Sequence, residues 1–231
     1  MNLRFIATYL FVIISFAAGA QTETAADSTK LINDDGKLVF EKVEIEASFA
    51  GGEMAWRKFL EKNLNPNVPV DNGAPCGKYT VYVQFVVNKE GSISDVKALT
   101  KNGYGMEQEV MRLIKIGPKW APALQHGRTV NAYRKQPVTF MVSDESFNIS
   151  SKEEYVLYMG IENPITITAD KVKADNLHVT ISQGSIVSKG DGNYVVKVNK
   201  EGRAVIQIYN AKKGNKEIGA ASFEVKPLSK P

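Results

Sequence analysis

The side chains that could do chemistry in this sequence are few, and their spacing is not that of a catalytic or metal site. His126 and His178 are the only histidines. Neither has a partner at the spacing of zinc-binding motifs such as H-E-x-x-H or C-x-x-C. The sequence also lacks the G-x-S-x-G turn of serine hydrolases and the glycine-rich loop of nucleotide-binding proteins. We therefore expect no enzyme activity, no cofactor and no small-molecule substrate.

Two acidic stretches and one cysteine are the remaining candidates for metal or redox chemistry. Asp34-Asp35 and Asp191-Gly192-Asn193 resemble fragments of a calcium loop, but both lack its alternating ligands and terminal glutamate. We expect them to cap turns. Cys76 is the only cysteine, so no disulfide can form within the chain. Its expected role is that of a small residue before a strand, and no metal site is predicted.

The composition is that of a globular protein with a substantial core. The chain has 231 residues, of which 43% are hydrophobic and 23% are charged. The formal net charge is +4, and the lysines and arginines are scattered along the sequence. Without a dense basic block, nucleic acid is not an expected partner.

The N-terminus has the layout of a secretory signal peptide. Met1–Arg4 is positively charged, Phe5–Phe16 is apolar, and small residues occupy positions 18–20. An uncleaved anchor in the inner membrane, facing the periplasm, is the alternative, although a spanning helix needs about 20 apolar residues. We predict a signal peptide at 1–20, a disordered leader at 21–37, which is polar and without periodicity, and export to the periplasm.

Between residues 38 and 142 the pattern predicts an α+β domain, an antiparallel sheet with two helices. Apolar residues at helical spacing predict helices at about 53–64 and 106–116. Alternating apolar residues predict strands at 38–45, 79–87, 93–99 and 137–142. The turn Asn88-Lys89-Glu90-Gly91 predicts that two of these strands form a hairpin.

A polar stretch at 143–152 is predicted as a linker to a second domain at 153–231. Beyond it, short alternating runs are separated by turn residues. They predict strands at 164–168, 177–182, 185–189, 194–200, 204–209 and 220–225. Regular short strands with frequent turns favour an all-β immunoglobulin-like sandwich.

Three ordered blocks in the first domain carry a family resemblance. They are FAGGEMAWRKFLEKNL at Phe49–Leu64, GKYTVYVQFVVNKEGSISDV at Gly77–Val96, and EQEVMRLIKIGPKWAPALQHGRTVNAYRKQPVTF at Glu107–Phe140. On these motifs, residues 40–142 resemble the TonB C-terminal domain family. The resemblance implies an α+β fold whose sheet edge pairs with the energy-coupling segment of an outer-membrane transporter.

The second domain carries a different resemblance. Its motifs are LYMGIENPITI at Leu157–Ile167, GNYVVKV at Gly192–Val198 and FEVKPLSKP at Phe223–Pro231. On these, residues 153–231 resemble a C-terminal immunoglobulin-like domain of the gliding-motility and type IX secretion protein GldM. The resemblance implies a periplasmic domain that contacts other proteins.

The strand that closes the first domain is the predicted partner-binding site. It consists of Gln136, Pro137, Val138, Thr139, Phe140, Met141 and Val142. Pro137 cannot donate a ladder hydrogen bond, which favours a position at a sheet edge or at the start of a strand. Unpaired backbone groups at such an edge can accept a strand from another chain. The alternative is that this strand is internal to the sheet.

Together these features predict a periplasmic cell-envelope protein that binds or couples its partners through the TonB-like domain. The expected partners are envelope proteins, such as an outer-membrane transporter or a secretion-complex subunit. One alternative is an inner-membrane-anchored TonB-type energy transducer for transport across the outer membrane. Another is an accessory subunit of a type IX secretion or gliding complex. The leader at 21–37 reaches only about 60 Å when extended, which favours the first hypothesis over an energy transducer with a long spacer.

Overall fold

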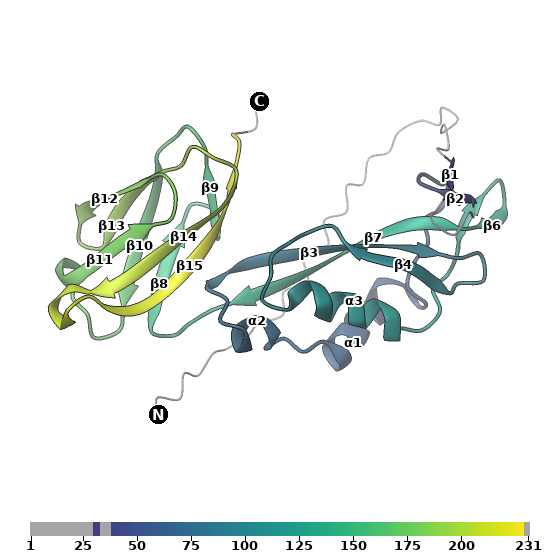
Figure 1. Ribbon diagram of the computed structural model, residues 1–231, viewed down its shortest axis with the longest axis horizontal. Coiled ribbons are helices and arrows are strands. Elements are labelled where there is room, and N and C mark those ends of the chain that lie inside the picture. The colour runs from purple at the N-terminus through teal and green to yellow at the C-terminus, as the bar shows by residue number, and fades with distance from the viewer. Residues whose placement is uncertain (1–29, 33–37, 229–231) are drawn as a thin grey trace. The chain divides into compact units, whose positions relative to one another are not determined.

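The computed structural model describes residues 30–32 and 38–228, which form two compact units (Figure 1). The N-terminal unit comprises the described residues up to 69 together with 80–139. The C-terminal unit comprises residues 70–79 and 140–228. The predicted signal peptide at 1–20 lies outside the described residues, as does most of the predicted leader. Within the described ranges, no helix is both long enough and apolar enough to cross a membrane.

The N-terminal unit is built on a sheet in which β3 lies between β7 and β4. Its strands are β1 (Lys30–Ile32), β2 (Leu38–Phe40), β3 (Cys76–Val87), β4 (Ile93–Ala98), β5 (Ala123–Gln125), β6 (Arg128–Val130) and β7 (Ala132–Val142). Next to β7 lies β2, which pairs with β1 on its other side, while β5 and β6 form a separate two-stranded sheet. The chain passes into the C-terminal unit at residues 76–79 of β3 and 140–142 of β7.

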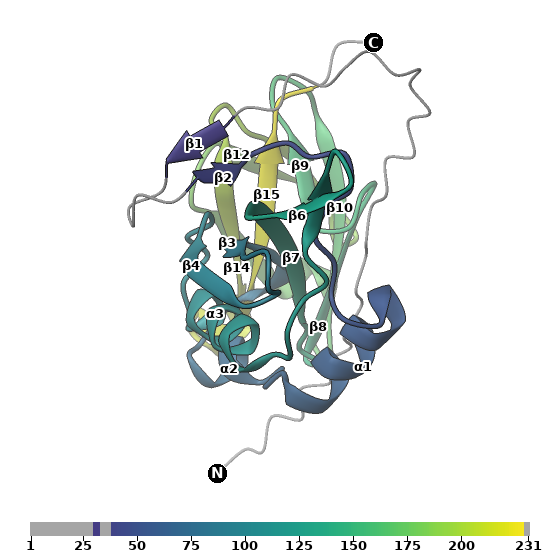
Figure 2. The same ribbon diagram turned by 90° about the vertical axis from the view of Figure 1, so that its right-hand side faces the viewer.

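Two helices, α1 (Gly52–Asn63) and α3 (Met106–Ile116), lie on one face of this sheet, and α2 (Val68–Asp71) is a single short turn (Figures 1 and 2). An aromatic cluster fills the space between helices and sheet. It consists of Phe49, Trp56, Phe59, Phe85 and Trp120, with neighbouring ring centroids between 4.9 and 6.0 Å apart. Trp120 follows α3 and is only 3% exposed, so its ring is part of the core.

The predicted hairpin turn forms between β3 and β4, and its glycine has a second role. The Gly91 N–H donates to the Asn88 carbonyl at 2.7 Å, and Gly91 has φ +80°. A Cβ at Gly91 would lie 2.2 Å from the carbonyl oxygen of Trp120, so only glycine fits here. The Trp120 N–H donates back to the Gly91 carbonyl at 2.9 Å. The turn is therefore hydrogen-bonded to the segment that carries the buried tryptophan.

The C-terminal unit consists mainly of one antiparallel sheet and one mixed sheet, which share one core. Its own strands are β8 (Phe147–Ser151), β9 (Val156–Tyr158), β10 (Asn163–Ala169), β11 (Leu177–Ile181), β12 (Ser185–Gly190), β13 (Asn193–Lys197), β14 (Gly202–Asn210) and β15 (Lys216–Lys226), with single 3-10 turns at Ala174–Asn176 and Ala211–Lys213. One sheet has the order β12-β13-β10-β8, and β15 lies between β9 and β14 in the other, which ends at β11. Ile165, Ile167 and Val196 from the first sheet and Ile206, Ile208 and Phe223 from the second belong to the same buried cluster.

The first residues of β3 complete this C-terminal unit. Cys76 and Gly77 pair in parallel with Ala221 and Ser222 of β15, and the Cys76 side chain is 6% exposed within the shared core. The Arg203 guanidinium lies 4.2 Å from the centre of the Tyr79 ring. It also donates hydrogen bonds to the Lys78 carbonyl at 3.3 and 3.4 Å. The start of β3 thus supplies part of the second unit's core.

The structure corrects three of the predicted boundaries. The predicted linker at 143–152 contains β8, whose alternation of Phe147 and Ile149 with polar residues is too short to stand out in the sequence. The predicted leader contains β1, a strand of three residues. It pairs with β2 through backbone groups, so its side chains give no pattern that the sequence could reveal. The first strand ends at Phe40, and beyond it Ile45 and Ser48 form only isolated bridges.

Candidate functional site

All seven residues of the predicted partner-binding strand lie on β7. Their burial alternates: Gln136, Val138, Phe140 and Val142 are buried, while Pro137 and Met141 are partly exposed. Thr139 departs from this alternation, because it is only 5% exposed. Burial alone therefore does not show which side of β7 faces outward, whereas its backbone contacts do.

The contact with β2 shows which backbone groups of β7 face outward, away from β3. The Phe40 N–H donates to the Asn131 carbonyl at 2.9 Å, and Phe40 pairs in parallel with Ala132. Successive residues of a strand direct their backbone groups to opposite sides. The N–H and C=O groups of odd-numbered residues on β7 therefore face the side on which β2 lies.

The contact with β3 leads independently to the same assignment. The Thr80 carbonyl accepts from the Asn102 side chain at 2.9 Å, and the Tyr82 carbonyl accepts from the Leu99 N–H at 2.8 Å, so both carbonyls face β4. The hydroxyl oxygens of Thr80 and Thr139 are 3.0 Å apart. That separation limits their Cβ atoms to about 6 Å, the spacing of directly opposed residues. Thr139 therefore occupies a non-hydrogen-bonded position, and its backbone groups point away from β3.

The outward side of β7 carries backbone groups that no strand within the described residues pairs beyond Ala132. Lys135, Pro137 and Thr139 are the odd-numbered residues along this stretch. Proline has no backbone N–H, and at position 137 this group would have faced outward. Pro137 therefore costs β7 no hydrogen bond to β3. Lys135 is exposed, Pro137 is partly exposed and Thr139 is buried. The accessible part of the edge thus lies near Lys135, at the start of the predicted strand and just before it.

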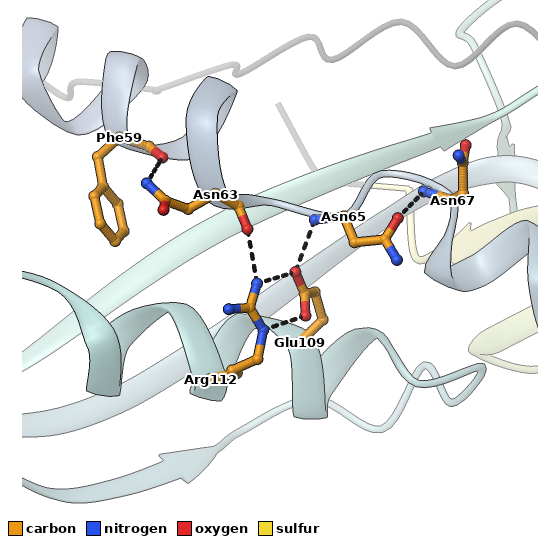
Figure 3. A network of polar contacts seen from close by, with 6 residues as sticks. All are labelled: Phe59, Asn63, Asn65, Asn67, Glu109 and Arg112. Carbon is orange, nitrogen blue, oxygen red and sulfur yellow. Dashed lines mark hydrogen bonds and ion pairs between the residues drawn. The ribbon is translucent and has the colours of Figure 1, made fainter.

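A polar network holds the end of α1 against α3, on the helical face of the same unit (Figure 3). The Glu109 carboxylate accepts two hydrogen bonds from Arg112, at 2.7 and 2.8 Å, and one from the Asn65 N–H at 2.8 Å. Arg112 also donates to the Asn63 carbonyl at 2.7 Å. Burial opposes ionisation of Glu109, but the hydrogen bonds from Arg112 and Asn65 outweigh it and lower the pKa of Glu109. The network fixes the two helices that support the sheet.

The side chains that could do chemistry are dispersed. His126 is 82% exposed, and its Nδ1 lies 3.0 Å from a carboxylate oxygen of Glu44. His178 belongs to the C-terminal unit, where its ring lies 5.9 Å from that of Tyr209. Cys76 is buried in the core of that unit. No group of three or more His, Cys, Asp or Glu residues that could hold a metal ion occurs in the part of the chain that the structure describes.

Two polar contacts were not anticipated from the sequence. Glu109 and Arg112 stand at the i,i+3 spacing of a helical ion pair, so that half of the network was detectable. Their link to Asn65 joins residues 44 positions apart and depends on how the helices pack. The stacking of Arg203 on Tyr79 likewise joins distant segments for which the sequence gives no signal.

Two regions of the chain match known families. Residues 79–142 match the family described as Gram-negative bacterial TonB protein C-terminal, and residues 146–226 match the GldM third domain. The chain therefore combines the two regions in the order that the sequence predicts. Both are domains of the kind through which envelope proteins contact one another, and neither indicates catalysis. The curated proteins contain no significant match to the chain.

Proposed function

We propose that the chain is a periplasmic binding or coupling protein that accepts an extended segment of an envelope partner along the outward edge of β7. The observation that carries this proposal is the row of outward backbone groups at Lys135, Pro137 and Thr139, beyond the single pair with β2. An added strand would receive main-chain hydrogen bonds there, and alternate side chains would provide specificity. The match of this region to the TonB C-terminal family supports the same use of a sheet edge.

The C-terminal unit has a second role in this proposal, as a contact domain for another envelope protein. Its match to the GldM third domain supports this role and favours an accessory subunit of a secretion or gliding complex as the second candidate function. We also propose that it is an immunoglobulin-like sandwich, a proposal supported by its two sheets, one antiparallel and one mixed, that share one core. The alternative of an anchored energy transducer depends on residues 1–20.

The edge is tested by crosslinking in cells that express the chain. A photo-crosslinking residue replaces Lys135 on the outward edge of β7, and in a matched control it replaces Lys115, which is exposed on α3. We expect a discrete adduct with an envelope protein from position 135 and none from position 115. Equal adducts from both positions would show that the helical face contacts the partner as closely as the edge does.

Three substitutions then separate backbone pairing from stability. Thr139→Pro removes an outward N–H, whereas Thr139→Val keeps that N–H and loses only the hydroxyl contact with Thr80. Val138→Pro removes an N–H that faces β3 and should lower the melting temperature more than Thr139→Pro does. We expect the adduct to disappear in folded Thr139→Pro and to persist in Thr139→Val. An undiminished adduct in folded Thr139→Pro would refute pairing along this edge.

A further inference from the structure

The face of the N-terminal sheet opposite the helices, termed the open face here, carries a distinct set of side chains. Those of Lys97 and Lys135 are exposed, whereas that of Thr139 is buried. On β3, Tyr79, Val81 and Val83 point toward the core. The even-numbered residues up to Gln84, after which a bulge shifts the pairing of β3 with β4, therefore point to the open face. Tyr82 there is 45% exposed, as is Leu99 just after β4. On β7 the odd-numbered residues share this face, because the Thr139 hydroxyl meets that of Thr80. The same residues of β7 thus present outward backbone groups and open-face side chains.

A lysine from β4 crosses this face to reach β7. The Lys97 ammonium nitrogen lies 5.9 Å from the centre of the Tyr133 ring. Since β3 separates β4 from β7, the two strands are about 10 Å apart, and the Lys97 and Tyr133 side chains together span this distance. The attraction between the ammonium group and the ring face favours this placement. The Lys97 charge therefore lies beside the ring of a β7 residue on this face.

The charged side chains on the open face beside β7 are both positive. Lys135 is exposed on the same face as Tyr133, two residues further along β7. The open-face positions are Thr80, Tyr82, Gln84, Lys97, Leu99, Tyr133, Lys135, Pro137 and Thr139. They include two lysines and no carboxylate, while Glu46 forms an ion pair with Arg134, an even-numbered residue of β7 on the other face. An anionic group above this edge would meet two ammonium groups and no opposing charge.

We propose that the partner segment accepted by β7 is acidic at alternate positions, with its carboxylates on the open face above Lys97 and Lys135. This inference rests on the proposed pairing along the β7 edge. Side chains of a strand alternate between faces, so carboxylates two residues apart lie in one row beside the lysines. The edge itself selects a polypeptide, because its outward N–H and C=O groups are matched by another peptide backbone.

Binding of three labelled peptides to the folded, full chain tests this inference, with fluorescence anisotropy as the measurement. In the peptides, valine alternates with glutamate, with glutamine or with lysine. We expect the glutamate peptide to bind more tightly than the glutamine peptide by about 2- to 5-fold for each lysine it meets. The advantage should shrink at high ionic strength, since the charges are exposed. The lysine peptide should bind most weakly.

Substitutions assign the preference to the two lysines. In a double variant that combines Lys97→Gln and Lys135→Gln, the glutamate and glutamine peptides should bind equally. The matched control is Lys115→Gln on α3, which changes the net charge but leaves the open face intact and should retain the preference. A preference that survives in the double variant would overturn the assignment to these lysines.

Thr139→Pro separates this inference from the proposed function. If the glutamate and glutamine peptides bind the folded wild-type chain equally and both lose affinity in Thr139→Pro, the edge pairs strands but the acidic preference is wrong. If the glutamate peptide alone binds and folded Thr139→Pro binds it unchanged, the lysines attract acid without strand pairing, which overturns both proposals. Failure of all three peptides to bind would also overturn both.

Discussion

The two units of this chain build their cores from different materials. The N-terminal unit packs large rings between two helices and a sheet, with Trp120 4.9 Å from Phe85 and 5.6 Å from Phe49. The C-terminal unit packs mainly branched aliphatic side chains between two sheets. A ring cluster depends on a few large residues, whereas an aliphatic core spreads its burial over many. Single substitutions should therefore lower stability more in the first unit, and loss of a segment should lower it more in the second.

The largest effect is expected from removing residues 70–79 from the C-terminal unit. A fragment of residues 143–228 lacks Cys76 and the Tyr79 ring that stacks on Arg203. We expect its melting temperature to lie more than about 10 °C below that of the same fragment with residues 70–79 tethered in front by a flexible linker. Thermal unfolding followed by circular dichroism measures the difference. Equal melting of the two fragments would show that this unit is complete without the start of β3.

The second effect is expected from Trp120→Ala in the aromatic cluster. The ring is 3% exposed and contacts three other aromatic residues, so its loss should lower the free energy of unfolding by about 3–5 kcal/mol. Hydrogen exchange should report the loss in α1 and β3 rather than in β14. The matched substitution in the other core is Ile206→Val, which should cost only about 0.5–1.5 kcal/mol. Similar costs for the two would erase the contrast between the cores.

The smallest effect is expected from Glu109→Gln in the network between α1 and α3. The variant keeps the shape of the side chain but loses its charge, and should cost about 1 kcal/mol at neutral pH because Arg112 is partly exposed. Folding lowers the pKa of Glu109, so its contribution is complete above the ordinary glutamate pKa of about 4.3. The contribution is lost as the pH falls below that value and through the folded pKa.

A pH series of denaturant titrations checks this assignment. The difference in unfolding free energy between the wild-type chain and Glu109→Gln should be constant at neutral pH and should narrow in acid. Glu61, exposed on α1, is the matched control, and Glu61→Gln should leave the stability nearly unchanged at every pH. A difference for Glu109→Gln that does not narrow in acid would mean that its charge is not what stabilises the network.

Local pattern was sufficient for the helices and for most of the strands. The 11-residue helix α3 begins and ends where the apolar spacing from Met106 to Ile116 predicts. The hairpin after Val87 follows from its turn residues. The helix and the hairpin depend on residues that are neighbours in the sequence, so the sequence alone is enough to predict them. The strands that were not predicted, β1, β5, β6, β8 and β9, have at most five residues each, which is too few for alternation to be recognised.

The repeated turn sequence Asn-Lys-Glu-Gly shows where local pattern stops. It occurs at Asn88–Gly91 and at Asn199–Gly202, and it marks a turn at both places. At Gly91 an added Cβ would strike the carbonyl of Trp120, whereas at Gly202 it would meet nothing within 4 Å. The glycine of the same four-residue sequence is therefore packed against the Trp120 backbone in one unit and has open space around it in the other. The difference comes from the residues that pack around each glycine and not from the four-residue sequence.

The sequence by itself determined the order of elements, the two family regions and the strand on which the candidate site lies. Tertiary structure decided which side of that strand is open. That assignment came from the hydroxyl contact between Thr80 and Thr139 and from the bond between Phe40 and Asn131, each of which joins residues far apart in the chain. Periodicity reports the face toward which a side chain points, but the side to which a backbone group points depends on which strands lie beside it. Long-range pairing also joined residues 70–79 to the C-terminal unit, because β15 pairs with the start of β3.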